Sequence, residues 1–446
     1  MQEIVESLKT FLRIPSISTL PEHKPDIRRA AEWVRDEILG AGLSASLIEG
    51  EGNPLVYGEW LGAPGKPTLL FYGHYDVQPP DPLEEWTSPP FEPEVRGQNI
   101  YARGASDDKG QTYALLLGVR SLMRRDGRLP VNVKFLVEGE EEAGGEHITA
   151  YVSSKPPGLK ADAAVIADTE MFAPEIPTLC VGLRGIVYGE MEVEGARQDL
   201  HSGVYGGAAP NPLMAVAEIL TALKDRDGRI QIPGFYDSVQ APTARELEAW
   251  RGLPFNEEEY RQKEVGSSEL TGEPGYSVLE RTWARPTLEV HGVRGGFTGT
   301  GAKTVIPARA VVKLSCRLVP DQKPEDVIRL IEAAVAAATP RGIKARFKSL
   351  HGAPASVVTT ESPFIHSAAR ALEEVFGSRT VYIRSGGSIP IVGLFQEKLG
   401  IPSVMMGFGL PDDNLHAPNE KFHLPNFYRG IEAVARYLEL LGQAAD

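Results

Sequence analysis

The first third of the chain alternates between two patterns of apolar and polar residues. Continuous apolar runs typical of buried strands are separated by segments with the spacing of amphipathic helices. The expected helices cover Glu3–Phe11, Asp26–Leu39 and Gly110–Met123, and the expected strands cover Pro67–Tyr72, Val131–Val137 and Ala163–Ala167. Because strands that alternate with helices pair in parallel, this pattern predicts an α/β unit with a mostly parallel sheet and helices on both faces.

The pattern changes after about Val181. Residues Ile186–Glu194 alternate as a half-solvated strand does, and residues 240–285 are strongly charged. The other elements expected here are a helix over Leu213–Leu223, strands over Leu288–Val293 and Arg309–Leu318, and a helix over Glu325–Ala338. This middle part therefore has the pattern of a separate α+β unit.

A break at His351–Pro354 ends the middle part, and helical patterns return at Ser362–Phe376 and Asn426–Leu441, with an apolar segment at Ile401–Met406 between them. We therefore expect the first domain to be discontinuous. Its two parts are predicted to cover residues 1–183 and 352–446, and the inserted lid or dimerisation domain to cover residues 184–351.

Composition narrows the class of protein. The 446 residues include 46 basic and 60 acidic side chains, a net charge of −14, which argues against a nucleic-acid partner or an anionic membrane. Only Cys180 and Cys316 occur, so a disulfide framework is not expected. The N-terminus lacks the pattern of a secretory signal, and no run approaches the roughly 18 apolar residues of a membrane span. We expect a cytoplasmic protein.

Candidate ligands follow the expected strands. In open α/β sheets, ligand groups lie just beyond the carboxyl ends of the strands. These positions hold Gly73-His74-Tyr75-Asp76, Glu138-Gly139-Glu140-Glu141-Glu142 and Asp168-Thr169-Glu170, while Asp107 and Asp108 precede a helix and His416 falls in a later loop.

Each of these groups has an ordinary explanation when it is taken alone. Asp107 suits a helix cap, an acidic run suits a solvated face, and most single histidines are structural. Acids that crowd at one sheet edge repel one another unless cations neutralise them. Two histidines and three carboxylates are typical ligands of Zn²⁺ or Mn²⁺, and their number suits two ions better than one.

Five motifs occur in the order GHYDVQP, GASDDKG, EGEEEAGG, IADTE and LHAPNEK. Together they closely resemble the dinuclear metallopeptidase family that includes aminoacylase, cytosolic non-specific dipeptidase, carnosinase, acetylornithine deacetylase and succinyl-diaminopimelate desuccinylase. The resemblance runs from about residue 5 to residue 440. It implies the zinc-exopeptidase fold with an inserted domain.

The resemblance also implies a ligand set of His74, Asp107, Glu142, Asp168 and His416 for two divalent ions per subunit, with Zn²⁺ the first choice and Mn²⁺ or Co²⁺ as alternatives. Asp107 would bridge the ions, with His74 and Asp168 on one and Glu142 and His416 on the other.

Two acids beside these ligands are expected to assist them. Asp76 corresponds to the acid that orients the histidine ring of His74. Glu141 would be the general base that takes a proton from the metal-bridging water and returns it to the departing amine. Glu138 and Glu140 are expected to be solvated or to stabilise the loop. The resemblance further implies a cis peptide bond between Asp107 and Asp108.

The remaining matches concern the substrate. His201 resembles the inserted-domain histidine that reaches the other subunit's site and stabilises an oxyanion, which implies a homodimer. Thr304, also from the partner, and Arg317, His351 and Ser388 would contact substrate. An arginine suits a terminal carboxylate because its guanidinium donates two parallel hydrogen bonds.

These features predict a metal-dependent hydrolase of amide bonds in dipeptides or short peptides. The charged stretch at 240–285 resembles the larger lid of the dipeptidase and carnosinase branch. The alternative is a deacylase that removes acetyl or succinyl groups from amino acids with the same metals and Glu141. A catalytically silent metal-binding protein is a third possibility, but neither Glu141 nor any ligand is missing.

Overall fold

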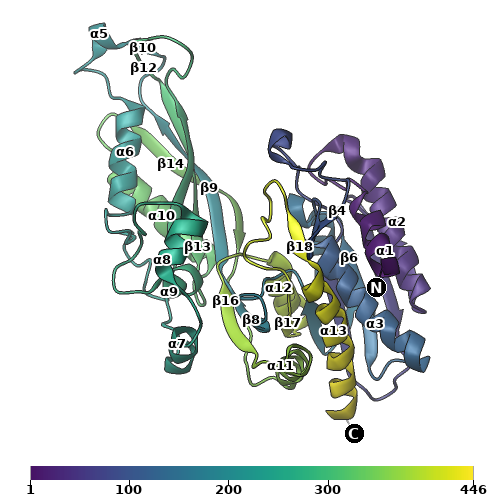
Figure 1. Ribbon diagram of the computed structural model, residues 1–446. Helices are drawn as coiled ribbons and strands as arrows, with labels where there is room; N and C mark the ends of the chain where they lie inside the picture. Colours follow the sequence, from purple (N-terminus) through teal and green to yellow (C-terminus); the bar gives the residue numbers. More distant parts are fainter. Residues whose placement is uncertain (1, 445–446) are drawn as a thin grey trace. The chain divides into compact units, whose positions relative to one another are not determined.

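The computed structural model describes residues 2–444 and divides the chain into two compact units (Figure 1). Unit 1 comprises residues 1–181, 358–383 and 394–446, and unit 2 comprises residues 182–357 and 384–393. Unit 1 is thus discontinuous in sequence. None of the helices in the described part is long and apolar enough to cross a membrane.

A mixed β-sheet forms the centre of unit 1, with strand order β1-β2-β6-β3-β7-β17-β8. Its strands are β1 (Ser44–Ile48), β2 (Leu55–Trp60), β3 (Thr68–His74), β6 (Asn132–Glu138), β7 (Ala163–Ile166), β8 (Thr178–Leu183) and β17 (Ser403–Met405). The four central strands, β6, β3, β7 and β17, pair in parallel. Antiparallel strands flank them on both sides. Strands β3, β6 and β7 are rich in apolar residues and are buried along almost their whole length, because both of their faces are covered.

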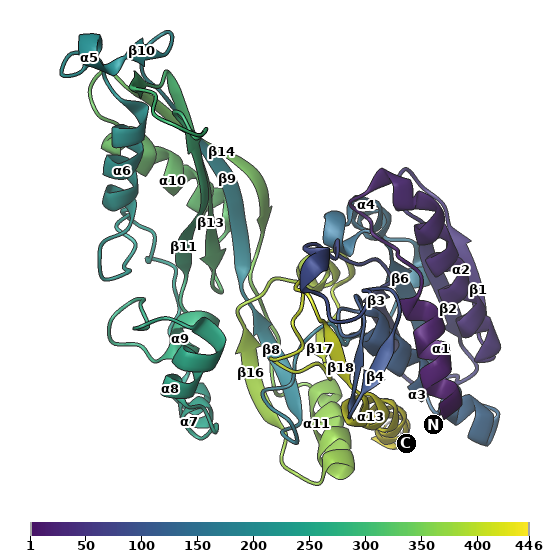
Figure 2. The ribbon, with the colours of Figure 1, turned by 45° about the horizontal axis from the view of Figure 1, so that its top comes forward.

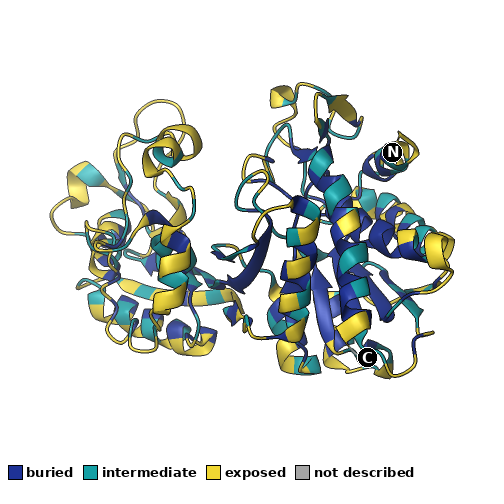
Figure 3. Cartoon of the chain, turned by 60° about the horizontal axis from the view of Figure 1, so that its bottom comes forward, coloured by how far each residue is buried: buried dark blue, intermediate teal, exposed yellow. Residues whose placement is uncertain are grey.

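Helices cover this sheet, and Figure 3 shows that they carry buried residues on one side and exposed residues on the other. They are α1 (Gln2–Leu12), α2 (Lys24–Gly40), α3 (Lys109–Asp126), α4 (Glu146–Ser153), α11 (Pro363–Phe376) and α13 (Leu424–Ala444). Helix α3 packs along α13, where Gly118 leaves room for Val434. A small sheet of β4 (Glu94–Arg96), β5 (Asn99–Tyr101) and β18 (Lys421–His423) completes the unit.

Unit 2 is built on an antiparallel sheet of four long strands with the order β11-β13-β9-β14 (Figure 2). These are β9 (Gly185–Glu194), β11 (Thr287–Gly295), β13 (Arg309–Leu318) and β14 (Lys344–Ala353). Helices α6 (Pro212–Leu223) and α10 (Pro324–Ala338) pack on the sheet and bury Ile219 and Ile331 against Met191 and Leu314. The alternating burial of β9 is the half-solvated pattern that the sequence predicts.

Shorter elements complete unit 2 and its connections. They are β10 (Leu200–His201), α5 (Ser202–Tyr205), α7 (Ala244–Arg251), α8 (Glu257–Glu259), a π-helical turn (Tyr260–Val265), α9 (Val278–Trp283), β12 (Val305–Ile306), β15 (Ser356–Val357), β16 (Val381–Ser385) and α12 (Pro390–Leu394). Residues 240–285 thus form short helices and loops. The break expected at His351–Pro354 comes slightly too early, because β14 continues through Ala353.

Candidate active site

The parallel strands of unit 1 bring the predicted ligands to one edge of the sheet. Strand β3 ends at His74, and β6 and β7 end at Glu138 and Ile166, shortly before Glu142 and Asp168. Since parallel strands end at the same edge, these side chains meet there. Asp107 precedes Asp108, the N-cap residue of α3, and joins them.

Five side chains form two overlapping clusters around Asp107. In the first, His74 Nε2 lies 3.1 Å from Asp107 Oδ1 and 4.0 Å from Asp168 Oδ2. In the second, His416 Nε2 lies 2.9 Å from Asp107 Oδ2 and 3.4 Å from Glu142 Oε2. The donor atoms of each cluster lie within 4.8 Å of one another, a spacing that a single ion can bridge. The two oxygens of Asp107 thus face different histidines.

The electrostatics of these clusters fit divalent cations. Burial, followed by repulsion from Asp107 and Glu142, raises the pKa of Asp168 to about 7. Burial would also raise the pKa of Asp107, but hydrogen bonds with His416 and His74 hold it well below its ordinary value. Hydrogen bonds to Asp107 and Glu142 raise the pKa of His416 to about 10. Protons on the imidazoles thus offset crowded negative charge, which a divalent ion offsets more effectively.

Asp76 contacts residues of both clusters. It is fully buried, and its backbone carbonyl and Oδ1 lie 3.1 Å and 3.4 Å from His74 Nδ1. Its two carboxylate oxygens also accept hydrogen bonds from the backbone nitrogens of Glu141 and Glu142, at 3.3 Å and 3.1 Å. Asp76 therefore holds the His74 ring and the Glu141–Glu142 turn in one arrangement.

Glu141 and Glu142 begin a 3₁₀ turn, Glu141–Ala143, directly after β6. On an extended strand, neighbouring side chains would point to opposite faces, so a turn is needed if both are to serve one site. Burial raises the pKa of Glu141 well above its ordinary value; His74 opposes this effect, and repulsion from Asp168 and Glu142 adds to it. A carboxylate whose pKa is raised in this way is a suitable proton acceptor near neutral pH.

The neighbouring acids Glu138 and Glu140 stabilise this loop. Glu138 is buried and accepts a hydrogen bond from the Tyr72 hydroxyl at 2.6 Å. Glu140 accepts hydrogen bonds from the backbone nitrogens of Asn53 and His147 at 2.7 Å and 3.1 Å. Of the two explanations that the sequence left open for these residues, the loop-stabilising one is correct.

Sequence reasoning missed Glu420, which positions the loop that carries Asp107. The Glu420 carboxylate is fully buried and accepts hydrogen bonds from the backbone nitrogens of Gly104, Ser106 and Asp107 at 2.9–3.1 Å. It also pairs with the buried guanidinium of Arg103 at 2.8 Å. Its place inside the motif LHAPNEK was the only signal in the sequence.

Two further contacts stabilise the ligands. Gln78 Nε2 donates to Glu142 Oε2 at 2.7 Å. Asp108 Oδ2 accepts a hydrogen bond from the Thr112 hydroxyl at 2.7 Å and a longer one from the His74 backbone nitrogen at 3.3 Å. The peptide bond between Asp107 and Asp108 is cis, as the resemblance implied.

The predicted substrate contacts all lie in unit 2, as two pairs and one separate residue. His201 and Thr304 are exposed and adjacent, because β10 pairs with β12 and the Ser202 nitrogen donates to the Thr304 carbonyl at 3.1 Å. Arg317, on β13, donates from Nη1 to Ser388 Oγ at 2.9 Å. His351 lies on β14 opposite Tyr188 of β9 and is exposed.

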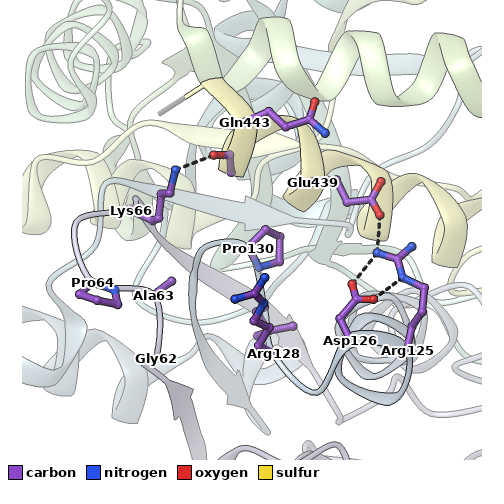
Figure 4. Close-up of a pocket in the computed structure, with 12 residues that line it drawn as sticks. Gly62, Ala63, Pro64, Lys66, Arg125, Asp126, Arg128, Pro130, Glu439 and Gln443 are labelled. Atoms are coloured by element: carbon purple, nitrogen blue, oxygen red, sulfur yellow. Dashed lines mark hydrogen bonds and ion pairs between the residues drawn. The ribbon is translucent and has the colours of Figure 1, made fainter. Parts of the chain in front are cut away.

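A cavity of about 880 Å³ elsewhere in unit 1 contains none of the ligand residues (Figure 4). It lies beside Gly62–Lys66, the end of α3 and the end of α13. Its charged groups are largely engaged, since Arg125 pairs with Asp126 and Glu439 and Lys66 donates to the Gly442 carbonyl. The chemistry of unit 1 is therefore concentrated at the ligand clusters.

Comparison with known proteins identifies the family. The sequence pattern of Peptidase family M20/M25/M40 matches residues 70–440. The chain belongs to this family. It is 32% identical to the Cys-Gly metallodipeptidase dug1 of Schizosaccharomyces pombe over 99% of this chain and 96% of that one. It is also 32% identical to the Beta-Ala-His dipeptidase of Homo sapiens, over 99% of this chain and 90% of that one.

A solved structure agrees with this assignment. An M20 family metallo-carboxypeptidase from Sulfolobus solfataricus superposes with a TM-score of 0.88 at 34% identity, covering 99% of this chain and 100% of that chain. The predicted fold class and the predicted metallohydrolase class are confirmed. Because the similar relatives are named dipeptidases, the dipeptidase prediction fits the chain better than the deacylase alternative.

Proposed function

We propose that this M20 peptidase hydrolyses dipeptides or short peptides with two divalent metal ions per subunit. His74, Asp107 and Asp168 would hold one ion, and Asp107, Glu142 and His416 the other, with Zn²⁺ as the expected metal and Mn²⁺ or Co²⁺ as alternatives. The observation that carries this proposal is the division of the Asp107 carboxylate between the two histidines, at 3.1 Å and 2.9 Å.

Bound divalent ions would polarise the scissile carbonyl and make water a stronger nucleophile. Glu141 would then accept a proton from the attacking water and return it to the nitrogen of the departing amino acid. Its buried carboxylate supports this role, because burial favours the protonated form that must exist between the two transfers. Asp76 would keep His74 and the Glu141–Glu142 turn in place throughout.

Residues of unit 2 would supply the contacts to the peptide. Arg317 would bind the terminal carboxylate, with His351 and Ser388 also in contact with substrate. His201 would donate to the carbonyl oxygen as negative charge develops there. We propose that His201 and Thr304 serve the active site of a second copy of the chain, so that the functional unit is a homodimer, and that the enzyme works in the cytoplasm.

The metal requirement is tested by removing ions with a chelator and then reloading the protein with Zn²⁺ or Mn²⁺. Hydrolysis of a free dipeptide such as Ala-Gly should disappear and then return, with close to two ions bound per chain. Full activity in metal-free protein would contradict the proposal. Full activity with a single ion bound per chain would contradict the two-metal part of the proposal and indicate a mononuclear site.

A further inference from the structure

Unit 2 contains a cavity of about 570 Å³ whose wall is basic. Its lining includes three acids, Asp225, Glu273 and Glu289. It also includes the basic residues Arg184, Lys224, Arg226, Arg281, Arg285 and Arg317. The lining thus has six basic and three acidic side chains, whereas the whole chain has a net charge of −14. A basic cavity within an acidic protein indicates an anionic ligand.

The three acids of the cavity are already engaged. Glu273 accepts from Arg285 at 2.7 Å and 2.8 Å and also pairs with Arg229 at 3.1 Å. Glu289 pairs with Lys224 at 2.8 Å. Asp225 accepts from backbone nitrogens of its own turn and from a glutamine amide. None of these carboxylates pairs with Arg184 or Arg317.

Arg184 is held by neutral groups only. Its Nε donates to the Gly386 carbonyl at 3.1 Å, and its Nη1 lies 3.3 Å from the Arg285 carbonyl. The Nη2 group lies so close to Gly386 that a Cβ there would come within 2.8 Å of it. The glycine therefore leaves room for the guanidinium, and within the described residues Nη2 has no acceptor.

Arg184 and Arg317 line the same cavity, and Ser388 connects the backbone of Arg184 to the guanidinium of Arg317. The Ser388 hydroxyl donates to the Arg184 carbonyl and accepts from Arg317 Nη1. Burial, and then repulsion from Arg317, lowers the pKa of Arg184 to about 10. Burial also lowers the pKa of Arg317. Two partly buried guanidiniums without a carboxylate are unfavourable, and an anion between them would relieve this repulsion.

We propose that this cavity is a second carboxylate subsite, which takes the side chain of an aspartate or glutamate at the C-terminal position of the peptide. The inference rests on the proposed function, in which Arg317 binds the terminal carboxylate. Arg184 then donates from Nη2 to the side-chain carboxylate of the same residue. The enzyme thus prefers peptides that end in an acidic residue to those that end in the matching amide.

The test compares Ala-Asp with Ala-Asn and Ala-Glu with Ala-Gln, because each pair has nearly the same shape and differs in charge. With the metal-loaded enzyme, kcat/KM for the acidic member should exceed that of the amide by about tenfold or more, mostly through KM. In Arg184→Met this ratio should fall to near one, and in Arg184→Lys it should be intermediate. Arg346→Met is the matched control, since Arg346 is an exposed arginine of the same unit that pairs with Glu192, and its ratio should stay unchanged.

Equal kcat/KM values for the acidic and the amide peptide in the wild type would overturn the proposal. This comparison needs no variant, so it tests the proposal even if Arg184→Met does not fold. A preference that persists in correctly folded Arg184→Met would also overturn it. Free succinate distinguishes the source of the anion: competitive inhibition by succinate without a preference for Ala-Asp would assign the cavity to a free dicarboxylate instead.

Calorimetry on metal-free protein separates this inference from the proposed function. Tighter binding of Ala-Asp than of Ala-Asn supports the subsite even if no dipeptide is hydrolysed. Hydrolysis of dipeptides without any difference in binding supports the proposed function and removes the subsite.

Discussion

Asp76 Oδ2 accepts a hydrogen bond from the backbone nitrogen of Glu142 at 3.1 Å. The contact joins the loop just after β3 to the turn that follows β6. The same carboxylate lies against His74, so one buried side chain fixes a candidate ligand on each of two neighbouring strands. The geometry of the two clusters therefore depends on a residue that is itself not expected to bind metal.

Replacing Asp76 with asparagine tests this dependence. Asparagine has a donor NH2 group in place of one carboxylate oxygen, so this group would face the backbone N–H of Glu141 or of Glu142 without accepting from it. We expect metal affinity and kcat/KM to fall by about 10- to 100-fold, the usual effect of losing a group that orients ligands. Metal titration and kinetics at saturating metal measure the two effects. Unchanged metal affinity and unchanged activity would show that Asp76 is not needed to position the ligands.

Glu141→Gln should abolish turnover without loss of metal. The amide cannot accept the proton, and we expect kcat to fall about 1,000-fold or more while the metal content stays near that of the wild type. Glu146→Gln is the matched control because Glu146 is an exposed acid just after the same turn. Substantial activity in Glu141→Gln would refute its role as the base.

His201→Ala should lower kcat while metal binding is unchanged, because His201 is outside both ligand clusters. If His201 serves the other subunit, mixed oligomers of His201→Ala and Glu141→Gln chains should regain part of the activity, since one of their sites would contain both intact residues. His366→Ala, at an exposed histidine of α11, is the control. Absence of rescue in verified mixed oligomers would count against a shared site.

Glu138 predicts a specific pH dependence of stability. Burial, with repulsion from Asp76 and Glu140, raises its pKa from 4.5 to about 8, although Tyr72 and His74 oppose the shift. Between these two pH values the folded state therefore binds more protons than the unfolded state. The stabilisation that comes from protonating Glu138 in the folded state is fully present below pH 4.5 and is lost as the pH rises toward 8.

Replacing Glu138 with glutamine should remove that contribution. Between pH 5 and pH 8 the free energy of unfolding of metal-free wild type should fall relative to Glu138→Gln, by on the order of 3 kcal/mol at most. Denaturant unfolding of both proteins at each pH gives the difference in their free energies of unfolding. The titration of the candidate ligands affects both proteins and therefore largely cancels in this difference. Parallel stability curves for the two proteins would show that Glu138 does not titrate in this range.

Much of unit 1 was predictable because three of its strands, β3, β6 and β7, are rich in apolar residues and end in or are followed by histidine or acids. The positions of His74, Glu142 and Asp168 near one sheet edge follow from that pattern and from parallel pairing, whereas Asp107 lies before helix α3 and was placed among the ligands by the family resemblance. The role of Glu420 was not predictable, because its partners lie more than 300 positions away in sequence. Strand β14 was missed because most of its residues are polar or exposed.

The inserted unit shows a different limit of sequence patterns. Its helices and long strands follow clear periodicities, but the grouping of Arg184, Arg317 and Ser388 depends on contacts between distant segments. No local pattern marks Arg184 as a residue without a carboxylate partner. The domain boundaries and the roles of His201, Thr304, Arg317, His351 and Ser388 stay predictions.

The most direct test of the account is the substrate class of the metal-loaded enzyme. Protein stripped by a chelator and reloaded with Zn²⁺ or Mn²⁺ is assayed on free dipeptides, tripeptides, and N-acetyl and N-succinyl amino acids. The account predicts chelator-sensitive hydrolysis with the highest kcat/KM for free dipeptides. A higher kcat/KM for the acylated amino acids would contradict it and assign the same metal site and Glu141 to a deacylase.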